Sequence, residues 1–174
     1  MELKNCNKSK RMNTISLYHQ NIHSVNNKID ELSIHMQTNS IGPHFICLTE
    51  HHLKEREINN LNLMGCKLAS EFCRKKFLGG GVCIFTNNKL SYSTMDLNQF
   101  CHEKTLEICA VKIHFEPFKL IIFCVYRAPT GNLNLFFKLL ENILNKFVQP
   151  NVNFSICGDL NINFLVKIMQ HQNF

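Results

Sequence analysis

Short apolar runs of strand length, spaced along nearly the whole chain, constrain the fold most strongly. Two segments have helical spacing instead: a helix capped by Ser24 and stopped by Gly42-Pro43, and a helix over Leu133–Phe147. Strand–helix–strand units at both ends, with hairpins between them, predict a mixed α/β domain whose two sheets pack together with helices outside. The runs expected to form strands are Thr14–Tyr18, His44–Thr49, Cys66–Phe72, Gly81–Thr86, Leu90–Ser93, Glu107–Phe115, Lys119–Tyr126 and Val152–Cys157.

The helices and turns carry more specific expectations. In the first helix the apolar residues Val25, Ile29, Leu32 and Met36 share one face, and in the second Leu135, Leu139, Ile143 and Phe147 do. Turns are predicted at Gly79–Gly81, where a phosphate-binding loop is the less favoured alternative, at Asn87-Asn88 and at Glu116-Pro117.

Length and composition describe one globular domain. The chain has 174 residues, 45% of them hydrophobic and 18% charged, and we expect residues 1–12 to be a disordered basic leader and residues 13–174 the domain. The net charge of +6 is compatible with a polyanionic partner and equally with an ordinary basic surface.

The nine cysteines do not resemble a disulfide framework. Cys47, Cys83, Cys109, Cys124 and Cys157 lie inside apolar runs, where a free thiol behaves as a small hydrophobic group. Their spacings fit no structural zinc pattern, and no apolar stretch is long enough to span a bilayer. We therefore expect a reduced, intracellular protein, nuclear or cytoplasmic, with no membrane partner.

Polar residues follow four of the apolar runs: Asn21, Glu50, Tyr126, and Asp159 with Asn161 in Gly158-Asp159-Leu160-Asn161. Each has an ordinary explanation by itself, because Gly-Asp begins many turns and a lone glutamate often ends a strand in solvent. Together they supply carboxylates for a hard cation such as Mg²⁺, an amide, and a phenol that can hydrogen-bond a phosphate. The set predicts phosphate chemistry.

Several motifs extend this set in order along the chain. They are His19-Gln20-Asn21-Ile22-His23-Ser24, Asn27-Lys28-Ile29-Asp30-Glu31-Leu32, Ile46-Cys47-Leu48-Thr49-Glu50-His51-His52-Leu53, Gly79-Gly80-Gly81-Val82-Cys83-Ile84-Phe85, Val125-Tyr126-Arg127-Ala128-Pro129 and Gly158–Asn161. Over residues 13 to 165 the chain resembles the endonuclease/exonuclease/phosphatase superfamily, and most of all the apurinic-type endonuclease domain of non-LTR (LINE-type) retrotransposons.

The resemblance implies a four-layered, DNase I-like α/β sandwich that hydrolyses phosphodiester bonds in DNA with Mg²⁺ or Mn²⁺ and no small organic cofactor. It implies that Asn21 and Glu50 hold the metal and that Tyr126 contacts the scissile phosphate. By the same resemblance, Asp159 prepares the attacking water and Asn161 stabilises the phosphate. Basic residues that are candidates for DNA contact are Arg74, Lys75, Lys76 and Arg127.

The sequence departs from the family pattern after Asn161. The family continues to a Ser-Asp-His motif, whereas the residues Ile162–Phe174 contain none. We therefore expect the final strands of the family fold to be missing. We also expect target-site nicking to be impaired, because one positioned acid or base typically raises the reaction rate by about 10²–10⁴-fold. Two alternatives stay open: an inactive remnant that at most binds nucleic acid, and a phosphatase acting on a small molecule.

Overall fold

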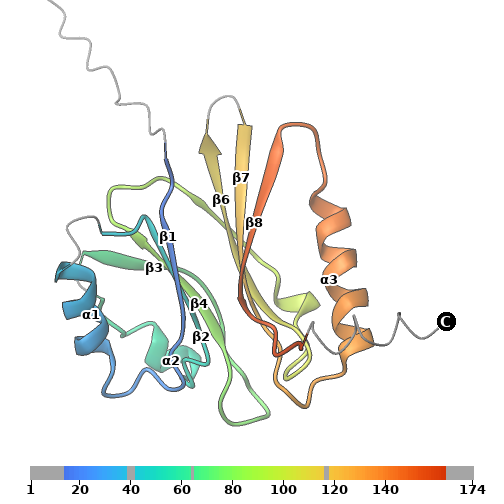
Figure 1. Cartoon of the computed structure of the whole chain (residues 1–174), viewed down its shortest axis with the longest axis horizontal. Helices are drawn as coiled ribbons and strands as arrows, with labels where there is room; N and C mark the ends of the chain where they lie inside the picture. The colour runs from blue at the N-terminus through green and yellow to red at the C-terminus, as the bar shows by residue number, and fades with distance from the viewer. Residues whose placement is uncertain (1–13, 39–41, 64, 116–117, 164–174) are drawn as a thin grey trace, which may run out of the picture.

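Two four-stranded sheets lie at the centre of the molecule (Figure 1). The computed structural model describes residues 14–38, 42–63, 65–115 and 118–163. The predicted leader and most of the segment after Asn161 lie outside these residues. In chain order the elements are β1 (Leu17–Asn21), α1 (Ile29–Thr38), β2 (Phe45–Thr49), α2 (Glu55–Ile58), β3 (Cys66–Phe72), β4 (Val82–Asn87), β5 (Ser93–Met95), a short 3₁₀ turn (Asn98–Phe100), β6 (Glu107–Phe115), β7 (Phe118–Tyr126), α3 (Leu133–Phe147) and β8 (Val152–Asp159).

Both sheets are mixed. The first has the order β1-β2-β4-β3 and the second β5-β6-β7-β8. Two neighbouring pairs are parallel, β1 with β2 and β7 with β8, and each pair is connected through a helix, α1 or α3. The other paired strands are antiparallel. The predicted mixed α/β architecture is confirmed.

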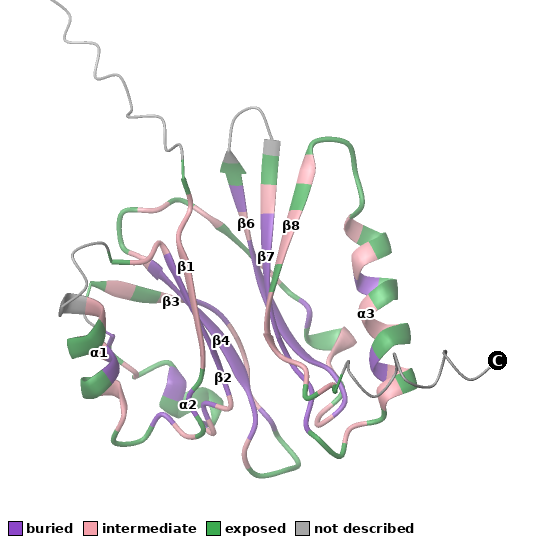
Figure 2. Ribbon diagram, viewed as in Figure 1, coloured by how far each residue is buried: buried purple, intermediate pink, exposed green. Residues whose placement is uncertain are grey.

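Side chains alternate between two apolar layers along the central strands, as a period of two requires. In β2, Phe45 and Cys47 face the second sheet, while Ile46 and Leu48 face α1 and α2. On the other sheet Phe123 of β7 packs toward α3. The buried residues in Figure 2 therefore lie along the strands, and the order of layers is helices, sheet, sheet, helix.

Most predicted elements match the structure. Those over Cys66–Phe72, Glu107–Phe115 and Leu133–Phe147 have the predicted limits, and β6 pairs with β7 as a hairpin whose predicted turn, Glu116-Pro117, lies outside the described residues. Three of the four residues predicted to form the apolar face of the first helix lie on it, with Leu32 buried and Ile29 and Met36 packed against the same cluster. Val25 is buried in this cluster too, but it precedes α1.

Three details were wrong. Ser24 does not cap α1, because Ser24 and Asn27 have left-handed backbone angles and the helix begins at Ile29. Asn87-Asn88 does not join a hairpin, since the chain crosses there to the other sheet and β5 begins only at Ser93. In α3 the predicted core residue Leu135 is only partly buried, and its neighbour Phe136 is fully buried instead.

The cysteines behave as apolar core residues. Cys47, Cys83, Cys109 and Cys124 are buried, and all the cysteines within the described residues are free thiols. No helix in the described part of the chain is long and apolar enough to cross a membrane.

Glu107, fully buried at the start of β6, connects the two sheets. Its Oε1 lies 2.6 Å from both Nε and Nη2 of Arg74 and accepts a hydrogen bond from Lys104 N at 2.8 Å. Its Oε2 accepts from Gly81 N at 2.7 Å. Gly79–Gly81, predicted to form a tight turn, instead lie at the end of the longer loop between β3 and β4. Gly80 and Gly81 are required there: a Cβ would lie 2.2 Å from the Arg74 guanidinium and 2.4 Å from the His51 ring.

Replacing Glu107 tests this connection. Glu107→Ala leaves the Arg74 cation and the Gly81 amide buried without their acceptor, so we expect the free energy of unfolding to fall by about 3–5 kcal/mol. Urea unfolding followed by circular dichroism measures it. Glu141→Ala, on the exposed face of α3, is the matched control and changes it by less than about 0.5 kcal/mol. Equal losses in the two variants would contradict this role of Glu107.

Candidate active site

The polar residues predicted at four strand ends lie together in the structure. Asn21 ends β1 and Glu50 follows β2 in the first sheet, while Tyr126 ends β7 and Asp159 ends β8 in the second. Parallel pairing places the ends of each pair side by side, with Tyr126 opposite Asp159. Asn21 Nδ2 then joins the two sheets, since it donates to Glu50 Oε1 at 2.9 Å and to Asp159 Oδ2 at 2.7 Å.

Glu50 is surrounded by hydrogen-bonding groups. Its Oε2 lies 3.0 Å from His23 Nδ1 and 3.3 Å from His52 Nε2. Burial by itself would raise the pKa of Glu50, but hydrogen bonds from Asn21, His23, Tyr126 and His52 outweigh burial and lower the pKa to about 2. The carboxylate is therefore ionised at neutral pH.

The sequence motifs assign no function to the two histidines. Both stand two residues after a predicted site residue, His23 after Asn21 and His52 after Glu50, and this spacing is the signal that the sequence offers. Proximity became visible only in three dimensions, where the rings lie 5.2 Å apart between centroids in an edge-to-face arrangement.

Asn21 is oriented as a hydrogen-bond donor to the carboxylates. Its Oδ1, the atom suited to bind a metal, accepts from His23 N at 3.2 Å. In this arrangement Asn21 positions Glu50 and Asp159, and its role as a metal ligand stays a prediction.

Tyr126 is buried beside the carboxylates. Burial, the negative charge of Glu50 and the hydrogen bond to Glu50 raise the pKa of the phenol far above its ordinary value. The hydroxyl therefore keeps its proton at neutral pH and acts as a hydrogen-bond donor.

A tight turn fixes Asp159 and Asn161. Asn161 N donates to Asp159 Oδ1 at 3.1 Å, and Asn161 Nδ2 donates to the Arg127 carbonyl at 2.8 Å. Gly158 is required just before them, because a Cβ there would lie 1.8 Å from Val125 O of the neighbouring strand. Close packing of β8 against β7 thus sets the position of the Asp159 carboxylate.

The basic residues divide into two kinds. Arg127 is buried, and its guanidinium donates to the carbonyls of Gly131, Leu160 and Asn161. Arg74 is buried against Glu107. Since these two side chains hold loops inside the protein, we retain only Lys75 and Lys76 as candidate DNA-binding residues.

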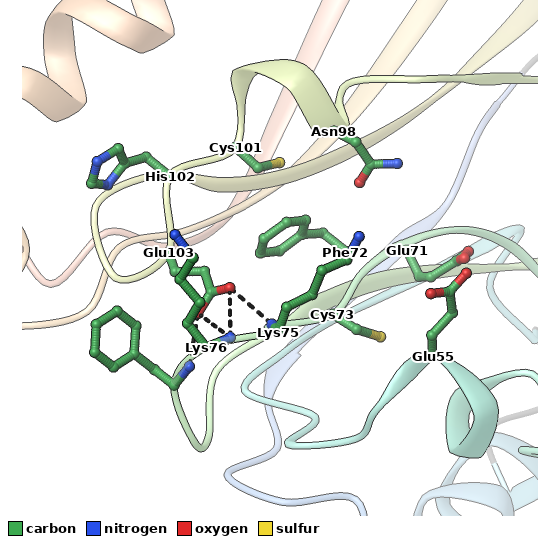
Figure 3. A pocket seen from close by; sticks show the side chains of 11 residues that line it. Glu55, Glu71, Phe72, Cys73, Lys75, Lys76, Asn98, Cys101, His102 and Glu103 are labelled. Carbon is green, nitrogen blue, oxygen red and sulfur yellow. Dashed lines mark hydrogen bonds between the residues drawn. The ribbon is translucent and has the colours of Figure 1, made fainter.

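Lys75 and Lys76 are exposed on the loop between β3 and β4. Their backbone amides, with that of Phe77, donate to the Glu103 carboxylate at 2.8–3.2 Å (Figure 3). The loop borders a cavity of about 440 Å³ that is also lined by Asn98, Cys101 and His102. Glu103 thus stabilises a loop that presents two lysines to solvent.

The backbone around Glu50 adopts left-handed angles that non-glycine residues rarely accept. The φ values are +57° at Glu50, +61° at His52, +44° at His23 and +49° at Asn161. Hydrogen bonds hold the strained segment, with Glu50 N donating to Gly81 O at 2.8 Å and His52 N to Gly80 O at 2.9 Å. Strain of this kind concentrates at functional sites, where it fixes side chains in place.

Comparison with solved structures identifies the fold. The endonuclease domain of TRAS1, a telomere-specific non-LTR retrotransposon, superposes with a TM-score of 0.62 and 12% identity over 87% of this chain. An AP endonuclease from Archaeoglobus fulgidus gives 0.60 and 15% over 86%, and a 3′ phosphatase from Neisseria bound to a product DNA hairpin gives 0.59 and 15% over 86%. The chain has the fold of the endonuclease/exonuclease/phosphatase superfamily.

This match confirms the DNase I-like fold that the sequence resemblance implies. The chain spans 62%, 58% and 58% of the length of these three proteins. No protein-family model and no curated protein sequence matches it. A shared fold does not fix the reaction, which depends on the residues of the site.

The hydrogen bonds around Glu50 predict its titration. Its carboxylate stabilises the fold above the unfolded pKa of about 4.3, and this contribution is lost as pH falls through the folded pKa of about 2. Asn21→Ala removes one donor and should raise the pKa of Glu50, as followed by the carboxyl ¹³C resonance against pH. Glu103 is the internal control and should titrate alike in both proteins. An unchanged Glu50 titration would contradict the arrangement.

Proposed function

We propose that this chain hydrolyses phosphodiester bonds in DNA with the help of a divalent metal ion. The observation that carries the proposal is the bridge from Asn21 Nδ2 to the carboxylates of Glu50 and Asp159. It gathers two negative groups from different sheets at one edge of the sandwich, beside a protonated tyrosine. Two neighbouring carboxylates repel each other, and a bound cation would offset this electrostatic repulsion.

The residues present suit such a cation. Glu50 is ionised and partly accessible, with 14% of its side chain exposed, so its oxygens can bind a hard or borderline metal. When bound, the metal would neutralise charge on the phosphoryl oxygens and on the leaving oxygen. Mg²⁺ and Mn²⁺ are the ions we expect from the family resemblance.

The remaining steps belong to the side chains. Asp159 accepts the proton of the attacking water through its carboxylate, whose orientation Asn21 and the Asn161 amide fix. The Tyr126 hydroxyl donates to a phosphate oxygen in place of Glu50. The Asn161 side chain, held by the Arg127 carbonyl, has a second N–H and an oxygen for the same phosphate.

DNA is the substrate class that the charges favour. The chain carries a net charge of +6, and Lys75 and Lys76 are exposed on a loop whose glycines hydrogen-bond the Glu50–His52 segment. A Neisseria protein with this fold has been solved with a product DNA hairpin, and a retrotransposon endonuclease shares the fold. By analogy we propose target-site nicking for a retrotransposon, inside the cell nucleus or cytoplasm.

Loss of either carboxylate should abolish cleavage. We expect Glu50→Gln and Asp159→Asn each to reduce nicking of supercoiled plasmid in Mg²⁺ or Mn²⁺ by about 10²–10⁴-fold. Glu141→Gln, on α3 and exposed, is the matched control and should retain full activity. Hydrolysis of a small phosphate monoester but not of DNA by the unaltered chain would show that the substrate assignment is wrong. If the unaltered chain cleaves neither substrate, the proposed enzymatic activity is wrong.

The exposed lysines should set the salt dependence of DNA binding. Lys75→Ala with Lys76→Ala should weaken binding and reduce the slope of log affinity against log salt by about 2, because two DNA phosphates are no longer neutralised. Fluorescence anisotropy with a labelled duplex measures the slope. Lys138→Ala on α3 should leave it unchanged, and an unchanged slope in the double variant would remove these lysines from the DNA-binding surface.

A further inference from the structure

Two imidazole rings converge on one oxygen of Glu50. His23 Nδ1 and His52 Nε2 lie 3.0 and 3.3 Å from Oε2, and the donor atoms of all three residues lie within 4.8 Å of one another. Donor atoms around a tetrahedral zinc ion are separated by about 3.3 Å, given bond lengths of about 2.0–2.2 Å. The spacing in the protein therefore suits three ligands of one transition-metal ion.

Backbone hydrogen bonds fix the position of this cluster. Ser24 N donates to Glu50 O at 2.7 Å, which ties the His23 segment to the Glu50 segment, and His52 N donates to Gly80 O. The His52 ring packs over Gly79, where a Cβ would lie 3.4 Å from Nε2. All three ligand residues have left-handed φ angles, so their side chains project from strained turns that are held by neighbouring chain.

Exposure differs between the ligands in a way that suits catalysis. The side chain of His23 is 78% exposed, whereas those of His52 and Glu50 are 24% and 14% exposed. Three protein ligands with one open side are typical of catalytic zinc sites, where water or substrate takes the fourth position.

We propose that His23, Glu50 and His52 bind a transition-metal ion of the Zn²⁺ class in preference to Mg²⁺. Imidazole nitrogen suits Zn²⁺ and its neighbours in the first transition row, while Mg²⁺ takes oxygen ligands. The amide oxygen of Asn21, which would favour Mg²⁺, is bonded to His23 N. This inference names the metal of the proposed hydrolytic site and rests on that function for its catalytic meaning, although binding itself is measured separately.

A second group of possible metal ligands, three cysteines, could also bind Zn²⁺ and has to be distinguished from the histidine cluster by experiment. Cys47, Cys124 and Cys157 bring three sulfur atoms together between the sheets. Cys124 and Cys157 donate hydrogen bonds to the carbonyls of Leu48 and Phe123. Zinc held there would be bound by sulfur, and its Co²⁺ form would show the intense thiolate-to-metal absorption that a nitrogen–oxygen site lacks.

The experiment is metal binding by the full chain. Calorimetry with Zn²⁺ and with Mg²⁺ alone, together with visible absorption of the Co²⁺ form, is measured for the unaltered chain and for four variants: His23→Ala, His52→Ala, Cys157→Ser and His114→Ala. We expect Zn²⁺ to bind more tightly than Mg²⁺, and each histidine variant to lose at least about 10–100-fold in Zn²⁺ affinity. Cys157→Ser and His114→Ala, an exposed histidine on β6, should bind Zn²⁺ as the unaltered chain does.

His23→Ala is the most informative variant, because the His23 side chain is exposed and its removal should not unfold the protein. Circular dichroism verifies that the variant is folded. Unchanged Zn²⁺ affinity in this variant, or affinity lost only in Cys157→Ser, would overturn the inference. Mg²⁺-dependent nicking without Zn²⁺ binding at the histidines would refute the inference and leave the proposed function standing. Zn²⁺ binding at the histidines without cleavage of DNA in any metal would support the inference and refute the proposed function.

Discussion

A single buried carboxylate, Glu107, connects the packing of the two sheets to the geometry of the candidate site. Its Oε2 holds Gly81 N, and the carbonyls of Gly81 and Gly80 in turn accept from Glu50 N and His52 N. The path runs from the start of β6 in one sheet, through Gly80 and Gly81, to the Glu50–His52 segment after β2 in the other. A shift of the sheets relative to each other would therefore move Glu50.

Glu107 can be buried because each of its oxygens is satisfied. Arg74, Lys104 N and Gly81 N supply donors, and Arg74 also lies over the Tyr126 ring, 5.8 Å from its centre. Removing one partner of such a network leaves a charge with nothing to replace water, so the network acts as one unit. Its members frame Tyr126, which stands opposite Glu107 in the strand pairing. Folding and the site thus depend on the same interactions.

The fold was predictable because the apolar pattern has a clear period. Strands buried on both faces, such as Phe45–Thr49, and a helix with one apolar face, Leu133–Phe147, leave few arrangements besides layered sheets and helices. The crossing of the chain after Asn87 was not predictable, because the same turn residues begin a hairpin or a change of sheet.

The site was predictable in part for a related reason. Residues at strand ends, Asn21, Glu50, Tyr126 and Asp159, are placed by the strands that precede them. His23 and His52 lie in turns with left-handed angles, which sequence patterns outside glycine and asparagine do not reveal. The buried state of Arg74 and Arg127 was equally hidden, because their partners are a distant carboxylate and backbone carbonyls.

The protein also shows how two carboxylates coexist in one site. Asn21 donates to both, and the two imidazoles face the Glu50 oxygen that Asn21 does not hold. If His23, Glu50 and His52 hold a metal as proposed, the Asn21 hydrogen bonds to Glu50 Oε1 and Asp159 Oδ2 would still position the two carboxylates. The low pKa of Glu50 follows from the same donors, and it keeps the carboxylate ionised well below neutral pH. The hydrogen bonds that compensate the charge of the carboxylates therefore also set the geometry of the candidate site.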